Sequence, residues 1–391
     1  MYNINMPKET NFQKDVDIGE SIAILVGTVI GAGILGIPFV VAKSGLGIGI
    51  IIMALVIIAL TYEKLFLAEI CLRTKEKHQL PGYAEKYLGK KGKWLLTFSE
   101  VFKYYGAMTA YIIGGGLILA EMFGGSAQSW TFIFFTVGAI LIYFGLKLIE
   151  KFELWMTIGI FIIVIGISMF AFKEFRIEQT LFFDITHSFT PYGVILLAFA
   201  GAVAVPEMRR VLQGQEKDLK KSILIGNSVI FLLYLLFTVT VIGVTGFKTT
   251  EIATVGLGQA IGPGVIILAN LFALFTMGTS FLTIGLALKN IYNYDYQINK
   301  NISWFLALSV PLIVYLLGVD SFIRTLDFIG ATAVGLTGIL IILMYWQAKK
   351  KGDRKPEFSF GMHKLIGLTI IVMFALGIVY AIYNNLSSLL T

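Results

Sequence analysis

Two apolar segments of this chain are interrupted by glycine and proline in a pattern that could bind a small polar molecule. The first covers residues 27–38 (GTVIGAGILGIP) and the second covers residues 199–206 (FAGAVAVP). Both residue types break the helical hydrogen-bond ladder and free backbone N–H and C=O groups. Groups freed within hydrocarbon must face protein, a cavity or a ligand. Each break is therefore a candidate binding site built from the backbone.

The freed groups predict what such a site would hold. Near Gly33 and Ile34, a half-helix begins with unpaired N–H groups and the positive end of its dipole, which suit a carboxylate. Carbonyls that end the other half-helices suit an ammonium group or a small cation. The alternative for a single segment is close helix packing, because Gly27 and Gly31 form a small-xxx-small pair. Two breaks at corresponding places in the chain favour the binding site, since paired interrupted spans mark the substrate site of secondary transporters.

Hydroxyl side chains form a second candidate site in a later apolar segment. Their spacing places them on one helical face, and hard oxygen ligands of this kind suit a sodium ion. The alternative is that each hydroxyl bonds to a carbonyl of the preceding turn. Both interpretations stay open for Thr276, Thr279, Ser280 and Thr283.

Ionisable residues within apolar segments also need an explanation, because charge inside a bilayer is costly and is usually paired or functional. They are Glu63, Lys64, Glu100, Lys103, Glu207 and Asp327. For the first three, the sequence favours snorkelling or structural pairing. Lys103 and Glu207 remain candidates for gating or proton coupling, Glu207 because it directly follows the second break.

The composition places all these segments in a membrane. Of the 391 residues, 57% are hydrophobic and only 14% are charged, whereas a soluble domain carries about 25% charged residues. Apolar runs long enough to cross a bilayer as helices recur along the whole chain. We therefore expect an all-α polytopic membrane protein with about eleven transmembrane helices, beginning near Ile18, Leu46, Trp94, Trp130, Leu154, Thr190, Ser222, Pro263, Ile302, Ser321 and Leu365.

The basic residues predict the orientation of these spans. With residues 1–17 as a cytoplasmic N-terminal tail, 24 of the 31 Lys and Arg residues fall on the cytoplasmic side, which is the positive-inside pattern. The formal charge of +7 then reflects topology and does not indicate a nucleic-acid partner. An odd number of spans places the C-terminus outside the cell, so we expect a multi-pass protein of the cell membrane.

The two broken segments also predict an internal repeat. They lie in the first and sixth spans, which open two halves of five spans each. Because five is odd, the halves must have opposite orientations, as in an inverted repeat. We expect one half at residues 18–175, the other at residues 190–347, and an added eleventh helix at residues 362–386.

Several other classes of protein are disfavoured. The three histidines, His78, His187 and His363, are widely separated and form no His-Glu-x-x-His motif, so a metal hydrolase is not indicated. A Walker A motif, a filter loop and a ring of charges are all missing, which disfavours an ATP-driven pump or a channel. The single Cys71 offers no thiolate partners for a metal. We expect a protein that is not an enzyme and has no cofactor, apart from a coupling sodium ion or proton.

These motifs resemble a known group of proteins. Residues 27–38 resemble the first-helix signature of the amino acid–polyamine–organocation superfamily, especially its amino acid/auxin permease and aromatic amino acid permease branches. Phe199-Ala200-Gly201 followed by Pro206-Glu207, and the run at residues 279–282, look similar as well. The resemblance implies a leucine-transporter-like fold of five plus five spans with broken first and sixth helices. Substrate would lie halfway across, between the first, third, sixth and eighth helices.

The resemblance also implies roles for individual residues. It places the carboxylate and amine of a substrate against Thr28, Gly31, Ala32, Gly33 and Ile34. It places the substrate side chain against Phe199, Ala200 and Ala202, with room left by Gly201, and makes Phe199 a gate. Relatives in the amino acid/auxin branch often carry a polar residue where this chain has Ala202. One tyrosine of the third span commonly faces substrate, and Tyr111 is nearest the middle of that span.

Ion coupling follows from the same resemblance. Thr279 and Ser280, beside Thr276 and with the carbonyls of Gly27 and Ile30, stand where sodium-coupled relatives hold an ion. Proton-coupled relatives place a lysine of the fifth span there, but the span at residues 154–172 has no interior lysine. Both ions remain candidates.

We therefore expect a secondary active transporter of neutral amino acids, because the predicted pocket segments hold no charged side chain to pair with a charged cargo. A non-transporting amino acid sensor of the same fold, and a transporter of another small zwitterion or amine, are the alternatives.

Overall fold

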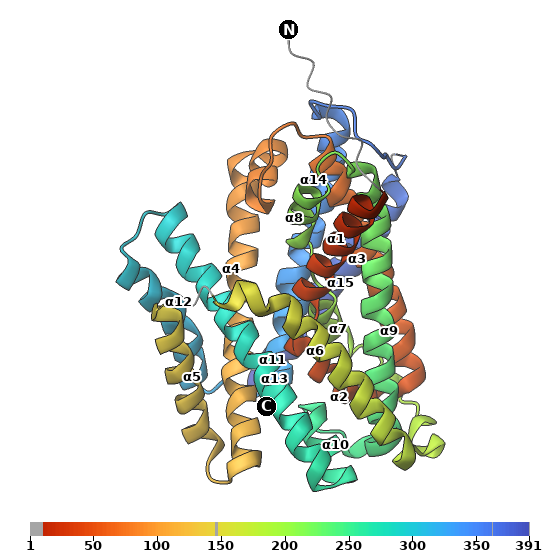
Figure 1. Ribbon diagram of the computed structural model, residues 1–391, viewed down its shortest axis with the longest axis vertical. Coiled ribbons are helices and arrows are strands. Elements are labelled where there is room, and N and C mark those ends of the chain that lie inside the picture. Colours follow the sequence, from red (N-terminus) through yellow and green to blue (C-terminus); the bar gives the residue numbers. More distant parts are fainter. Residues whose placement is uncertain (1–10, 145–147, 362, 391) are drawn as a thin grey trace.

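The computed structural model describes residues 11–144, 148–361 and 363–390, and within these ranges the chain is helical and contains no strand. Figure 1 shows the helices packed as one bundle. Seven helical segments are long and apolar enough to cross a membrane. They are α3 (Leu46–Leu72), α4 (Leu80–Phe123), α5 (Ala127–Phe144), α9 (Leu219–Thr245), α11 (Pro263–Asn290), the segment from α13 (Phe322–Ile329) through a π-helical turn to α14 (Gly335–Lys351), and α15 (Lys364–Leu390).

An eighth span is bent by 54° between its two halves. It consists of α1 (Asn11–Val29), the short 3₁₀ helix η1 (Ala32–Leu35) and α2 (Ile37–Ser44). Further helices are the apolar α6 (Leu148–Ala171) and α12 (Lys300–Leu316), and a short pair formed by the apolar α7 (Tyr192–Ala198) and the charged α8 (Ala204–Val211). The chain is thus an all-α multi-span membrane protein, as its composition predicts.

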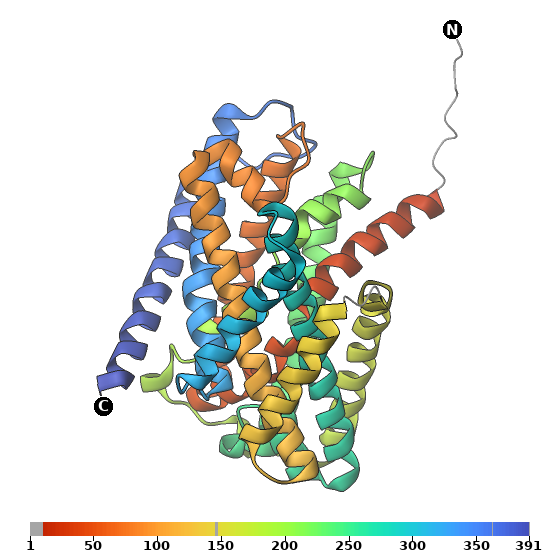
Figure 2. The ribbon, with the colours of Figure 1, turned by 90° about the vertical axis from the view of Figure 1, so that its left-hand side faces the viewer.

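The two ends of the bundle differ in charge. At one end, drawn at the top of Figures 1 and 2, α3 ends, α4 begins, and α8 and α14 end. We call it the basic face, after residues such as Lys86, Lys93, Arg210 and Lys349 that lie there. At the other end lie α2 and the short helix α10 (Ala253–Ile261). The chain enters the bundle at the basic face with α1 and leaves at the opposite end with α15 (Figure 2).

Two helix boundaries differ from those expected. The helix α1 begins at Asn11, within the segment predicted as a tail at residues 1–17; residues 1–10 lie outside the described part. The helix α4 begins at Leu80, well before Trp94, and spans 44 residues. Pro81 sits in its first turn, where proline is tolerated, and Gly89 takes a positive φ of 76° at a kink. The helix therefore extends beyond its apolar part into the basic segment.

A network of polar groups ties the basic face together. The buried carboxylate of Glu69 accepts hydrogen bonds from Arg73 Nε at 2.8 Å, Lys349 Nζ at 2.6 Å and Phe360 N at 2.8 Å. These contacts join α3, α14 and the connection before α15. Because every charge in this cluster is paired, the cluster fixes the helix ends without leaving a bare charge in the bundle.

Candidate functional site

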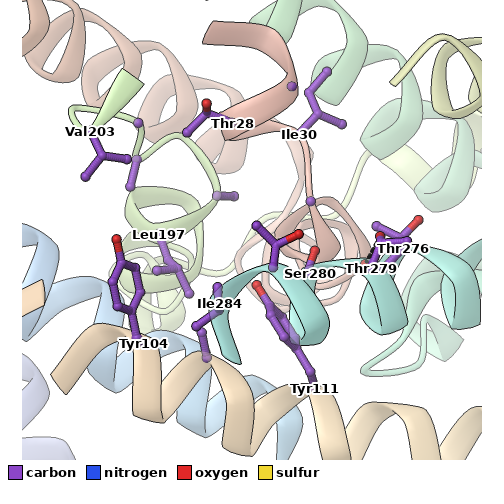
Figure 3. A pocket seen from close by; sticks show the side chains of 18 of the residues that line it. Thr28, Ile30, Tyr104, Tyr111, Leu197, Val203, Thr276, Thr279, Ser280 and Ile284 are labelled. Atoms are coloured by element: carbon purple, nitrogen blue, oxygen red, sulfur yellow. Dashed lines mark hydrogen bonds between the residues drawn. The ribbon is translucent and has the colours of Figure 1, made fainter. Parts of the chain in front are cut away.

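The two broken segments meet at one cavity of about 290 Å³ in the middle of the bundle (Figure 3). Residues from α1, η1, α4, α6, the α7–α8 break and α11 line its wall. Most of the predicted site residues are among them: Gly27, Thr28, Ile30, Gly31, Gly33, Lys103, Tyr111, Ala200, Gly201, Thr276, Thr279 and Ser280. The structure thus gathers, around one space, residues from both halves of the chain.

Five predicted residues do not line this cavity. Ala32 and Ile34 are fully buried, because successive residues of the tight η1 turn point in different directions and these two pack into the bundle. Phe199 is also fully buried, with its ring against Tyr234 at a centroid distance of 5.0 Å. Ala202 is buried, and Glu207 lies further along α8, where it pairs with Arg210 at 2.6 Å and accepts from Gln79 Nε2 at 2.9 Å.

The first break exposes backbone to the cavity. Helix α1 ends at Val29, and Gly31 takes an extended conformation with φ −140° and ψ −158° before η1 begins. The first N–H groups of a helix have no partner within it. A Cβ atom on Gly33 would lie 3.0 Å from Ala198 Cα, so only glycine lets η1 approach α7 this closely. The break therefore presents N–H donors beside the second broken segment.

The second break, residues 199–203, frees carbonyl groups whose partners come from distant helices. Lys64 Nζ of α3 donates to Phe199 O at 3.0 Å. The hydroxyl of Tyr234, on α9, lies 3.3 Å from Ala198 O and 3.1 Å from Val29 O. Its one proton is donated to one carbonyl at a time. Tyr234 thus touches the last carbonyl of α7 and the last carbonyl of α1, and it bridges the two breaks.

Sequence reasoning missed these two partners. Lys64 is fully buried and donates to a carbonyl, so of its two predicted roles structural pairing is confirmed and snorkelling is excluded; Tyr234 was not predicted. The available signal was a polar side chain in the middle of a long apolar span, a place where a buried group needs a partner. Asp327, another of the ionisable residues, lies beside the start of α7: a Cβ atom on Gly193 would be 2.3 Å from its Oδ1.

The hydroxyl face of α11 lines one side of the cavity (Figure 3). Thr276 Oγ1 donates to Phe272 O at 2.8 Å, and Thr279 Oγ1 donates to Thr276 O at 3.1 Å, so both bond back to their own helix. Each oxygen keeps lone pairs that can accept. Ser280 lies beside the Tyr111 hydroxyl, and its Oγ is 3.2 Å from where a Cβ of Gly31 would be. Helix α6 contributes the apolar Ile160.

A partly buried ion pair lies where this cavity approaches a larger one. Lys103 lines the first cavity and pairs with Glu100 at 2.6 Å. Glu100 also accepts from Thr337 Oγ1 at 3.0 Å and lines a cavity of about 840 Å³ with Lys90, Lys93 and Trp94. Tyr104 and Val203 line both cavities. The central cavity is therefore adjacent to a space on the basic-face side of the bundle.

Comparison with known proteins assigns a family to this arrangement. Residues 14–383 match the model of the tryptophan/tyrosine permease family. The chain belongs to that family. This permease is accordingly a member of a family of amino acid transporters and not an enzyme, and the resemblance to the aromatic amino acid permease branch is confirmed.

Three curated relatives cover nearly the whole permease. The tyrosine-specific transport system 1 of Haemophilus influenzae is 26% identical, with 92% of this chain and 94% of the relative aligned. The glutamine transporter 2 of Aliivibrio fischeri is 23% identical, with 90% and 97% aligned. The tryptophan-specific transport protein of H. influenzae is 23% identical, with 92% and 94% aligned.

A solved structure supports the fold of the permease. The crystal structure of MhsT in complex with L-phenylalanine superposes with a TM-score of 0.63 at 13% identity, and covers 93% of this chain and 97% of that one. The expected leucine-transporter-like fold is therefore confirmed along the length of the chain.

Proposed function

We propose that this permease is a secondary active transporter of neutral amino acids with aromatic or amide side chains, working by alternating access. The observation that carries this proposal is the central cavity, which is lined both by the break between α1 and η1 and by the break between α7 and α8. Broken helices facing one another at mid-bundle supply a carboxylate with N–H groups and an ammonium with carbonyls. The relatives named for tyrosine, tryptophan and glutamine support this choice of cargo.

The cavity suits a zwitterion with an uncharged side chain. The carboxylate would lie at the start of η1, near Gly31 and Gly33, and the amine near the carbonyls that end α1, beside Thr28. The side chain would extend between Tyr104, Tyr111 and Leu197, where aromatic rings offer a large apolar surface. Lys103 is the charged side chain in the described lining, and Glu100 neutralises it at 2.6 Å. A charged cargo would therefore lack a free partner.

We further propose the eleven-span arrangement, with α1–α2 and α7–α8 as the broken first and sixth spans. The added spans beyond the eight long ones would be α6, α7–α8 and α12. The halves at residues 18–175 and 190–347 would then form the inverted repeat, with α15 added. The basic face would lie in the cytoplasm by the positive-inside rule, which puts the C-terminus outside. The larger cavity beside Tyr104 then indicates a state that faces the cytoplasm.

Ion coupling supplies the driving force in this proposal, with sodium or a proton as the ion. Oxygen atoms of Thr276, Thr279 and Ser280 line the cavity beside Gly27 and Ile30, which supports a sodium site. The charged pair of Lys103 and Glu100 at the cavity edge supports a proton. We expect Glu207 to have no part in coupling, because Arg210 and Gln79 already occupy its carboxylate.

The test is uptake of radiolabelled L-tyrosine, L-tryptophan and L-glutamine into proteoliposomes, with an inward sodium gradient in one set and an inward proton gradient in another. Accumulation above the external concentration in either set is the expected result. Uptake confined to lysine or glutamate would contradict the neutral cargo. Saturable binding without uptake in any set would contradict transport and favour a sensor.

A further inference from the structure

Two charged residues stand side by side in the middle of a membrane span. Glu63 and Lys64 lie within α3, with 1% and 0% of their surfaces exposed. Charges placed this deep are costly and are usually tied to an ion or proton pathway. Neither side chain reaches the end of the span, so the two differ from the surface pairs of the basic face.

Lys64 is hydrogen-bonded to the backbone of the break between α7 and α8. Its ammonium donates to Phe199 O at 3.0 Å, at the end of α7. Its stem runs along the break as well, since a Cβ on Gly201 would lie 3.4 Å from Lys64 Cε. Residues on either side of Phe199, namely Ala198 and Ala200, line the central cavity. The position of the ammonium therefore bears directly on the shape of the substrate site.

Glu63 is the opposite case, a buried carboxylate without a hydrogen-bond partner. Neither of its oxygens has one among the described residues, whereas Glu69 and Glu100 each accept several. The charges that act on it are Lys64 on its own helix and Lys103 and Glu100 on α4. A bare buried carboxylate is far more costly than the neutral acid. A proton on Glu63 therefore removes a large part of that cost.

We propose that Glu63 is the proton-binding site of this transporter, and that Lys64 transmits its protonation state to the break between α7 and α8. The inference rests on the proposed function and commits it to the proton. With Glu63 ionised, its carboxylate and the Phe199 carbonyl both attract the same ammonium. When Glu63 takes up a proton, one O–H bond forms, the first attraction is lost, and the ammonium is held by the carbonyl alone.

Two of the charged groups that act on Glu63, Lys103 and Glu100, line the cavities toward the basic face. Glu100 lines the larger cavity on that side and Lys103 lines the central one. In this proposal, a proton leaving Glu63 toward the cytoplasm would pass to Glu100, the carboxylate that lines the larger cavity. In this proposal, proton binding at Glu63 is linked to the hydrogen bond between Lys64 and Phe199 O, because the two residues Glu63 and Lys64 are adjacent in α3.

The test compares proton-driven accumulation of L-tyrosine with its counterflow, which needs substrate exchange and no ion gradient. For Glu63→Gln, we expect counterflow within about threefold of wild type, and accumulation driven by an inward proton gradient reduced at least about tenfold. The pH profile of counterflow should become flat. The matched control is Glu121→Gln at the exposed end of α4, which removes an equally charged group that accepts from Gln259 at 2.8 Å and should behave as wild type.

Lys64 has a separate readout as a positioning residue. Lys64→Met should weaken L-tyrosine binding at every pH, because the Phe199 carbonyl loses its donor and Glu63 its neighbouring charge. Lys64→Arg should restore binding in part and keep the pH dependence. Equal pH profiles for wild type and Lys64→Met would overturn the linkage.

Other outcomes separate this inference from the proposed function. Normal proton-driven accumulation in Glu63→Gln, or wild-type accumulation that needs sodium and ignores pH, would overturn the proton site while transport stands. Absence of both counterflow and accumulation in the wild type would overturn the function and this inference with it. If Glu63→Gln does not fold, Glu63→Asp is the variant to measure. A shift of about half a pH unit or more in the midpoint of proton-driven accumulation would support the proton site. An unchanged midpoint would overturn it.

Discussion

The two breaks in this transporter are held in different ways. Around the first break, the contacts are neutral: Tyr234 reaches Val29 O, Ser280 lies beside Gly31, and Gly33 packs directly on Ala198. Around the second break, the Phe199 carbonyl is held by the ammonium of Lys64. The Tyr234 hydroxyl reaches both breaks, so the feature that distinguishes the second break is its additional charged partner, Lys64.

The difference separates two tasks. Neutral hydroxyls and close glycine contacts hold a geometry that does not change with pH, which suits a rigid receptor for the backbone atoms of a substrate. A buried ammonium with a bare carboxylate beside it responds to one proton, because its surroundings cannot screen the change. The first break is thus suited to recognition and the second to response.

The largest effect is expected when the close contact of the first break is filled. In Gly33→Leu, the added side chain meets Ala198 at once, since the Cβ alone would lie 3.0 Å from it. Overpacking costs about 1–3 kcal/mol, and leucine also covers the N–H groups, so L-tyrosine binding should fall beyond detection in a scintillation proximity assay. Gly19→Leu in α1 of the same bent span, where a Cβ meets nothing within 4 Å, is the control. Wild-type affinity in Gly33→Leu would contradict a backbone receptor at this break.

The second largest effect on L-tyrosine affinity is expected for Tyr234, whose hydroxyl bridges the two breaks. Tyr234→Phe removes a buried hydroxyl that serves Val29 O and Ala198 O, leaving a carbonyl unpaired. That loss costs about 1–3 kcal/mol, so we expect L-tyrosine affinity to fall about tenfold with the protein still folded. Because the removed group is neutral, the pH profile of counterflow should keep its wild-type shape. A profile that flattens as in Glu63→Gln would erase the contrast between the breaks.

The hydroxyl face of α11 offers a finer comparison. Ser280→Ala removes a hydroxyl beside Tyr111 and Gly31, whereas Thr276→Val removes one already bonded to Phe272 O. We expect a loss of affinity of about fivefold for Ser280→Ala and of less than about twofold for Thr276→Val, because the Thr276 hydroxyl already donates within its own helix. Isothermal titration with L-tyrosine measures both. A larger effect at Thr276, appearing with sodium alone, would instead support a sodium site.

The smallest effect is expected for a charge remote from both breaks. On the basic face, the hydrogen bond from Lys86 holds the pKa of Asp353 below its usual range, and Asp353 also accepts from Lys75 N at 2.8 Å. This stabilisation is complete above the ordinary carboxyl pKa and is lost as pH falls through the lowered folded value. Asp353→Asn should lower the melting temperature slightly at neutral pH, and the difference should vanish in acid. The change in melting temperature should be small because partly exposed ion pairs contribute about 1 kcal/mol or less to stability. Transport should be unchanged because Asp353 is remote from both breaks.

Much of the candidate site could be predicted from the sequence, because its signals are local. Glycine and proline mark both breaks at residues 27–38 and 199–206, and hydroxyl spacing marks the face of α11. Other predictions needed side-chain directions that spacing does not supply. Ala32 and Ile34 sit beside Gly31 and Gly33 in the chain, yet the η1 turn points them into the packed bundle. Phe199 likewise turns its side chain away from the cavity: its ring packs on Tyr234, and its carbonyl accepts a hydrogen bond from Lys64.

By itself, the sequence determined that the chain crosses a membrane as helices and where two of those helices break, because hydropathy and backbone freedom are properties of short segments. Only the tertiary structure decided which groups satisfy the freed carbonyls. Lys64 reaches Phe199 across 135 positions and Tyr234 reaches Val29 across 205. Partners so far apart in the chain are chosen by the packing of α3 and α9 against the breaks, and no local pattern carries that information.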